Sequence, residues 1–483
     1  MIPIDETFVD SAAPNAGAIS KGKGLARKGK LVVLNKDADD TIIFGECKGS
    51  GKSNYATSVD FTDPTNPTYR CSCPSRQFPC KHALGLMYAW AYGQTFVVAD
   101  VPDDVATKRA KAVERVAKRK ERAAKPKKVN KKALAKKIDA QLEGLDVLER
   151  MTHDLVRSGL GALNPKTART LEEKAKELGN AFLPGAQNAL RSLTTLFADA
   201  DDNVHERGDR RREAIYTEAL DRLTRLQMIG QRGRAYLEAR KADPELTPDT
   251  ESTIAAWLGH AWQLSELRQH GLFEKKAELV QLYFRSYDDP ARQEMVDVGA
   301  WLNLKSGQIQ LTKNYRPYRA ATFIKEDDCF FHVKQVETLY RYPGDENPRV
   351  RWDGSTHRSL TAADVAAVRG RAGRSLPAVV KRIKNQLKDP LASNHPYALV
   401  AYRRFGRVGE AVVLEDADGE RIELRDDRRV DPFATVSLLP LVDRALHADQ
   451  VALLAFLPDL DDHRLRAKPL TLVSEHQIVR LAL

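Results

Sequence analysis

The segment that decides the fold runs from Tyr69 to His82 and reads Tyr-Arg-Cys-Ser-Cys-Pro-Ser-Arg-Gln-Phe-Pro-Cys-Lys-His. Two cysteines lie one residue apart, and after six residues a cysteine and a histidine lie one residue apart: Cys71, Cys73, Cys80 and His82. In an extended segment residues i and i+2 point to the same side, so both members of each pair can face one ion. Three thiolates and an imidazole supply all four ligands of a closed tetrahedral site, which predicts a structural Zn²⁺ rather than a catalytic one.

The same four residues resemble the SWIM zinc finger, whose pattern is C-x-C, a short spacer and C-x-H. The flanking residues 45–55 (Gly-Glu-Cys-Lys-Gly-Ser-Gly-Lys-Ser-Asn-Tyr) and the Ala-Leu-Gly-Leu after His82 are similar to the bacterial branch of that family. The resemblance covers roughly residues 40–93. It implies protein–protein or DNA binding. Bacterial relatives of this layout look like companions of MoxR-type AAA+ ATPases and von Willebrand factor A proteins, so the resemblance also implies an AAA+ ATPase as partner.

Length and composition describe a globular protein of two to four domains, since the chain has 483 residues, of which 42% are apolar and 30% charged. No apolar run approaches the ~18 residues that span a bilayer. The first seven residues have neither a basic nor an apolar stretch, so no secretory signal is expected. Five cysteines, one of them far from the rest, make a poor disulfide framework. We therefore expect a cytoplasmic protein.

Charge is concentrated in residues 108–137, where fifteen Lys and Arg stand against two Glu, a net of +13. The whole chain carries +11, which leaves about −2 for the remainder. This segment could neutralise several phosphates, but it holds no Phe, Tyr or Trp for base stacking. Three interpretations stay open: a solvated helix or linker, non-specific nucleic-acid contact, or contact with an acidic protein. The nucleic-acid interpretation names the basic candidates Arg70, Arg76, Lys81, Lys118, Arg119, Lys120, Lys127 and Lys128.

The pattern along the chain predicts a multidomain α+β protein. Short β-branched runs from residue 31 to 61 indicate a small antiparallel sheet ahead of the finger, and residues 81–92 a helix after it. Apolar residues at helical spacing continue from Lys131 to roughly Asp288, after which the period changes to two. The predicted parts are a flexible terminus (1–28), the sheet and finger (29–95), a basic helix or linker (100–137), a helical bundle (138–290), an α+β domain (291–392) and a β-rich domain (393–483).

Two features of the C-terminal half are specific enough to test. Residues 362–387 are expected to form one helix, and Asp418-Gly419 lies between two apolar runs, which is typical of a β-hairpin.

Other motifs favour plain structural interpretations. Gly51-Lys52-Ser53 matches the end of a P-loop, but Glu46 stands where its first glycine should be, so a hairpin turn is expected. Cys47 could be a further thiol near the metal, but a small strand residue is the better account. Cys329 and His332 are expected on a half-exposed strand. Because no catalytic constellation is readable, we expect a non-enzymatic zinc-binding interaction protein, with DNA binding as the alternative.

Overall fold

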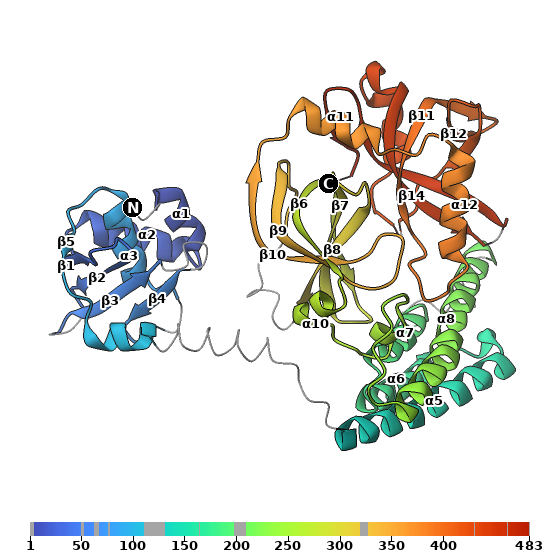
Figure 1. Cartoon of the computed structure of the whole chain (residues 1–483), viewed down its shortest axis with the longest axis horizontal. Coiled ribbons are helices and arrows are strands. Elements are labelled where there is room, and N and C mark those ends of the chain that lie inside the picture. Colours follow the sequence, from blue (N-terminus) through green and yellow to red (C-terminus); the bar gives the residue numbers. More distant parts are fainter. Residues whose placement is uncertain are drawn as a thin grey trace. The chain divides into compact units, whose positions relative to one another are not determined.

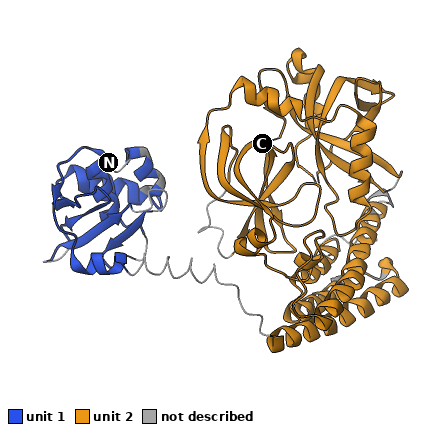
Figure 2. Cartoon of the chain, viewed as in Figure 1, with its two compact units in different colours: residues 1–126 blue, residues 127–483 orange. Residues whose placement is uncertain are grey.

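The computed structural model describes residues 4–49, 53–61, 67–75, 78–110, 131–163, 165–197, 209–318, 327–428, 430–460 and 462–482. The chain divides into two compact units, Met1–Pro126 and Lys127–Leu483 (Figure 2). The predicted basic helix or linker falls largely on residues 111–130, which lie outside the described residues. Residues 103–110, just before that stretch, are helical.

Unit 1 is built on one mixed sheet with the strand order β4-β3-β2-β1-β5 (Figure 1). Its strands are β1 (Leu31–Lys36), β2 (Ile42–Cys47), β3 (Tyr55–Asp60), β4 (Thr68–Cys71) and β5 (Val97–Val98). Neighbours from β1 to β4 are antiparallel, and β5 pairs with β1 in parallel. Helix α3 (Lys81–Ala91) packs against the sheet and buries most of its own residues. The predicted small sheet and following helix are confirmed.

The N-terminal residues correct the prediction of a flexible terminus, because they form helices α1 (Glu6–Ala12) and α2 (Ala16–Arg27). Asp5 and Asn15 cap the two helices by accepting hydrogen bonds from backbone N–H groups. Both helices contact α3. The prediction was wrong because α2 packs through small residues. Gly22 lies so close to α3 that a Cβ there would stand 2.9 Å from the Leu84 Cβ.

Unit 2 begins with a helical layer whose members are α5 (Lys131–Ser158), η1 (Leu160–Ala162), α6 (Pro165–Asn180), α7 (Pro184–Thr195), α8 (Asp209–Ala242), α9 (Ile254–Trp257) and α10 (Leu264–Gln269). The longer helices share one core that includes the fully buried Leu145, Leu190 and Leu226. This confirms that helices occupy the region.

The helical region ends earlier than predicted, because residues 273–289 form the long strand β6 (Phe273–Asp289). Most of its central residues are buried, and they contribute to two different cores: Leu279 to one and Val280 to the other. A strand covered on both faces does not alternate regularly between apolar and polar residues, so its periodicity does not distinguish it from a buried helix.

Two sheets complete unit 2. The first has the order β10-β9-β6-β7-β8 (Figure 1), and the second has the order β13-β12-β11-β14-β15-β16. The bounds in the first sheet are β7 (Glu294–Asn303), β8 (Ile309–Pro317), β9 (Val333–Arg341) and β10 (Val350–Arg358). Those in the second are β11 (Tyr397–Val408), β12 (Ala411–Glu415), β13 (Arg421–Leu424), β14 (Ala448–Asp459), β15 (Arg464–Val473) and β16 (Ile478–Arg480). The predicted hairpin at Asp418-Gly419 is confirmed by the antiparallel pairing of β12 with β13.

The two sheets share one apolar core, in which Leu282 of β6 and Leu302 of β7 lie with Leu453 of β14 and Leu470 of β15. A boundary between residues 392 and 393, as predicted from the sequence, would divide this core. The sequence pattern missed it because pairing partners far apart in the chain leave no local trace.

Short helices cover parts of these sheets: α11 (Ala362–Gly370), α12 (Leu376–Leu387), α13 (Thr435–Leu438), η3 (Leu439–Leu441) and η4 (Arg444–Leu446). The single helix predicted for residues 362–387 is therefore two helices. The break occurs because Gly373 joins the edge of β11: its N–H donates to the Leu399 carbonyl, and its carbonyl accepts from the Ala401 N–H. Among the described residues, no helix combines the length and apolar character needed to cross a membrane.

Candidate metal centre

The first pair of predicted ligands lies at the end of strand β4. Cys71 is the last residue of β4, and the next residue, Ser72, is hydrogen-bonded to β3. The Ser72 N–H donates to the Ala56 carbonyl oxygen at 2.9 Å, and the Ser72 hydroxyl accepts from the Ala56 N–H at 3.0 Å. These two hydrogen bonds fix the residue between Cys71 and Cys73, and so they position both sulfur atoms.

The second pair lies at the start of α3. Cys80 is the residue before the helix, in an extended conformation, and its side chain makes no capping hydrogen bond. His82 is held within the first turn, and its ring lies against that of Tyr55 with 4.9 Å between the ring centroids.

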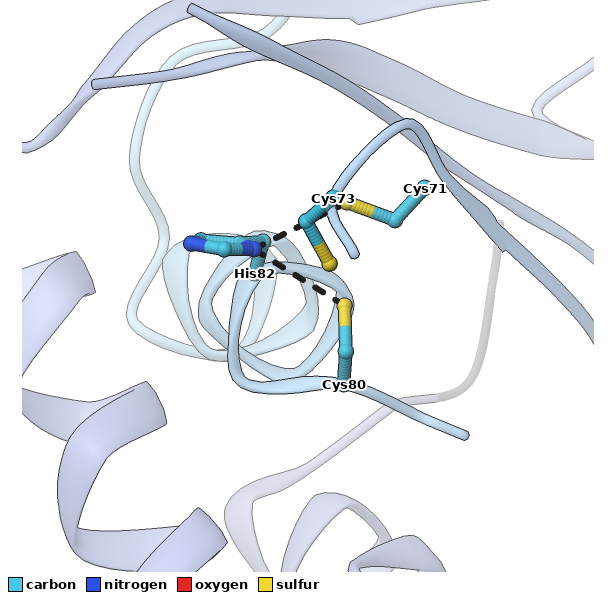
Figure 3. Close-up of side chains that lie close together, drawn as sticks. All are labelled: Cys71, Cys73, Cys80 and His82. Atoms are coloured by element: carbon cyan, nitrogen blue, oxygen red, sulfur yellow. Dashed lines mark hydrogen bonds between the residues drawn. The ribbon is translucent and has the colours of Figure 1, made fainter. Parts of the chain in front are cut away.

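The four side chains converge on one point (Figure 3). The sulfur atoms of Cys71 and Cys80 lie 3.7 and 3.9 Å from Nδ1 of His82. All four ligand atoms, including the Cys73 sulfur, lie within 4.8 Å of one another. Around a tetrahedral zinc, sulfur and nitrogen donors are about 3.6 Å apart, given the usual Zn–S and Zn–N bond lengths. The spacing and the donor types therefore fit Zn²⁺.

Electrostatics at the helix start favour a thiolate at Cys80. A hydrogen bond from Cys71 opposes the effect of burial, and the His82 side chain and the backbone N–H groups of Ala83 and His82 also point at the Cys80 sulfur. Together these groups hold the pKa of Cys80 well below its usual range. The hydrogen bond with Cys80, reinforced by burial, raises the pKa of Cys71 in turn. Because a thiolate is the form that ligates metal, Cys80 is the member of the pair that is prepared for a cation.

The site is closed by the protein. Cys73, Cys80 and His82 are buried, and Cys71 is half-buried. Four protein ligands leave no coordination position for a substrate, which is the arrangement of a structural zinc. Bound there, the ion would tie the end of β4 to the start of α3.

The remaining cysteines stay outside the cluster. Cys47 is fully buried in β2, where burial raises the pKa of its thiol, and it belongs to the apolar core of unit 1. Cys329 and His332 precede β9 rather than lying on a strand, so the expectation of a half-exposed strand is wrong. Among the residues that the structure describes, the finger supplies the one group of His, Cys, Asp or Glu with ligand spacing.

Two of the predicted nucleic-acid contacts can be placed. Lys81 is exposed at the first turn of α3. Arg70 instead lies largely buried on β4, with its Nη1 3.9 Å from the Asp60 carboxylate. The other candidates, Arg76, Lys118, Arg119, Lys120, Lys127 and Lys128, lie outside the described residues.

Comparison with known families supports the same centre. The family model of the SWIM zinc finger matches residues 61–91, a range that contains all four ligands. No curated protein and no solved structure matches the chain. The chain therefore contains a SWIM zinc finger in unit 1, whose Cys and His residues are arranged to hold zinc.

Proposed function

We propose that this chain is a non-enzymatic interaction protein in which zinc folds the SWIM unit and the folded unit recognises a protein partner. The observation that carries the proposal is the closed cluster of Cys71, Cys73, Cys80 and His82, which uses every ligand position for protein atoms. Such an ion stabilises a small unit and does no chemistry on a substrate. The surface that the ion holds in place is then the functional part.

The partner class comes from the resemblance of the finger to its bacterial relatives. Those relatives favour a MoxR-type AAA+ ATPase, with this chain as its adaptor or substrate-recognition subunit. Cytoplasmic location is part of the same proposal.

The experiment is cross-linking of the zinc-loaded chain to a purified MoxR-type ATPase, read by mass spectrometry. We expect cross-links from Lys81, which is exposed beside the metal site, and their loss when Cys71→Ser removes a ligand. Cross-links confined to unit 2, or cross-links unchanged by Cys71→Ser, would contradict the role of the finger.

The alternative function is DNA binding through the finger and the adjacent basic segment. One observation favours it: the +13 charge of residues 108–137 follows the zinc unit directly in the sequence. Opposed to it is the burial of Arg70 on β4, since a largely buried guanidinium is a poor ligand for the phosphates of a duplex.

Fluorescence anisotropy of labelled duplex DNA, single-stranded DNA and RNA over a salt series separates the two functions. If the basic segment binds phosphate, log K falls with log salt by about 0.9 for each phosphate contacted on duplex DNA. A control lacking residues 108–137 would lose that slope. Flat traces at low salt would rule out the nucleic-acid function and leave the protein partner.

A further inference from the structure

The outer face of the unit 1 sheet carries a hollow of about 620 Å³, whose lining includes one of the four metal ligands, Cys71. Ser58 of β3 stands opposite Phe44 of β2 and Arg70 of β4, so these three side chains share one face. Their neighbours Ile43 and Val59 point the other way, into the core beneath α3. We call this hollow the finger groove. Its lining includes Phe44, Ala56, Ser58, Arg70, Phe78 and Val105.

The walls of the finger groove are held by two separate elements. On one side Val105, from the helical residues 103–110, packs on Ile42 and Phe44 and covers part of the sheet. On the other side Phe78 extends from the loop between the two pairs of metal ligands, with 50% of its surface exposed. A zinc ion bound by the four ligands would therefore fix both ends of the loop that carries one wall.

The floor of the groove contains hydrogen-bond donors without acceptors. Ser58 is 2% exposed, and its hydroxyl has no hydrogen-bond partner. Nη1 of Arg70 is also buried without one, since the Asp60 carboxylate at 3.9 Å is beyond hydrogen-bond distance. Buried polar atoms in native proteins are nearly always paired, so two such donors in a hollow indicate an acceptor that a ligand brings. A peptide carbonyl oxygen is such an acceptor.

The rim of the groove is acidic although the chain as a whole is basic. Glu46, Asp100 and Asp104 are exposed there. The exposed lining cation Lys108 forms an ion pair with Asp104 at 3.1 Å. A peptide that places an apolar side chain on Phe44 and Ala56 would bring its neighbouring residues next to these carboxylates. Charge complementarity then favours Lys or Arg at those neighbouring positions.

We propose that the finger groove binds a short peptide segment of a partner protein, with one large apolar side chain flanked by Lys or Arg. The apolar side chain fills the hollow, a main-chain carbonyl accepts from Ser58 and Arg70, and the basic flanks meet the acidic rim. This inference rests on the proposed role of the SWIM unit in protein recognition, and it names the chemistry that the unit recognises.

The test uses the full zinc-loaded chain and a labelled pentapeptide with a central phenylalanine flanked on each side by two lysines, measured by fluorescence anisotropy. We expect it to bind at least about tenfold more tightly than the same peptide with glutamates in place of the lysines. The net charge of +11 on the chain would produce the opposite order, so a preference for lysine reports the local rim.

Two substitutions locate the binding. Ala56 is exposed and lines the groove, so Ala56→Trp fills it without removing a buried group, and the Kd of the lysine peptide should rise about tenfold or more. Ala106→Trp is the matched control, because Ala106 is exposed in the same unit but does not line the groove. It should leave the Kd within about twofold. Native zinc content in both variants shows that the unit is folded.

Three results would overturn the inference: no binding of the lysine peptide by the native chain, preference for the glutamate peptide, or equal binding by the Ala56→Trp variant. The proposed function fails separately. If the peptide does not bind but zinc-dependent cross-links to the ATPase persist, the SWIM unit recognises its partner through another surface.

Discussion

The two units solve the same problem of stability by different means. Unit 1 covers one face of its sheet with α3 and leaves much of the other face to the finger groove, and its core counts the ligands Cys73 and Cys80 among its buried residues. In unit 2, strand β6 is covered on both faces, and helices and sheets build several apolar cores. A sheet with one open face buries less apolar surface. Unit 1 therefore obtains from a metal part of the folding stability that unit 2 obtains from apolar packing.

Loss of the metal should produce the largest difference in stability between the two units. Cys71→Ser or His82→Ala is expected to lose the zinc and to unfold roughly residues 30–93, because metal binding and folding are one equilibrium worth on the order of 10 kcal/mol in small zinc units. Unit 2 should keep its structure. Zinc analysis and hydrogen exchange, followed separately for peptides of each unit, measure both effects.

The matched control is Cys47→Ala. Cys47 is a buried cysteine of the same unit that lies outside the cluster. This variant should keep stoichiometric zinc. If a ligand variant also keeps stoichiometric zinc and native protection, the assignment of four ligands is wrong.

A buried ion pair provides the corresponding test in unit 2. Asp297 accepts from Nε and Nη2 of Arg316 at 3.0 and 2.8 Å, and both side chains are buried. Asp297→Asn leaves the guanidinium buried without this carboxylate, and the free energy of unfolding of unit 2 should fall by about 3 to 5 kcal/mol. Urea unfolding measures the change. The double variant Asp297→Leu with Arg316→Met should recover most of it, whereas no recovery would show that the loss has another cause.

The same pair predicts a response to acid. Burial alone would raise the pKa of Asp297, but Arg316, the Asp327 N–H and the Ser286 hydroxyl hold it below its usual value. A carboxyl with a lowered pKa stabilises the fold at pH above the ordinary value of about 4, and this stabilisation is lost as pH falls below that value. Unit 2 of the native chain should therefore lose stability below about pH 4 more steeply than unit 2 of Asp297→Asn.

The smallest expected effect tests whether the N-terminal helices belong to unit 1. In Gly22→Leu the new side chain would meet Leu84 and Tyr88, whose nearest atoms lie 2.9 and 3.0 Å from the position of a Cβ. Undocking α2 from α3 should destabilise unit 1 by about 1 to 3 kcal/mol. Gly24→Ala is the matched control in the same helix, since nothing lies within 4 Å of its Cβ, and it should stabilise the unit by about 0.5 to 1 kcal/mol. Equal effects from both changes would mean that α2 does not dock. Thermal unfolding and hydrogen exchange of unit 1 give the answer.

Local patterns made the metal centre predictable. Its ligands occupy twelve consecutive residues, so their spacing alone brings them together, and the hairpin at Asp418-Gly419 is equally local. The finger groove was missed because Phe44, Ser58 and Arg70 meet only through the register of three strands. The N-terminal helices were missed because glycine, which is a poor helix former, is used in α2 for close packing.

The contact between the last strand of unit 2 and its first strand, β6, has a consequence for the synthesis of the protein. The Arg480 side chain, at the end of β16, donates to the main-chain carbonyl of Gln281 in β6, 199 residues earlier in the chain. Elongation adds about 5 to 20 residues per second, so a nascent β6 waits roughly 10 to 40 s for the strands that cover it. During that interval its apolar centre is available to other emerging chains. A ribosome-associated chaperone is therefore most useful to this protein between the emergence of residues 273 and 480.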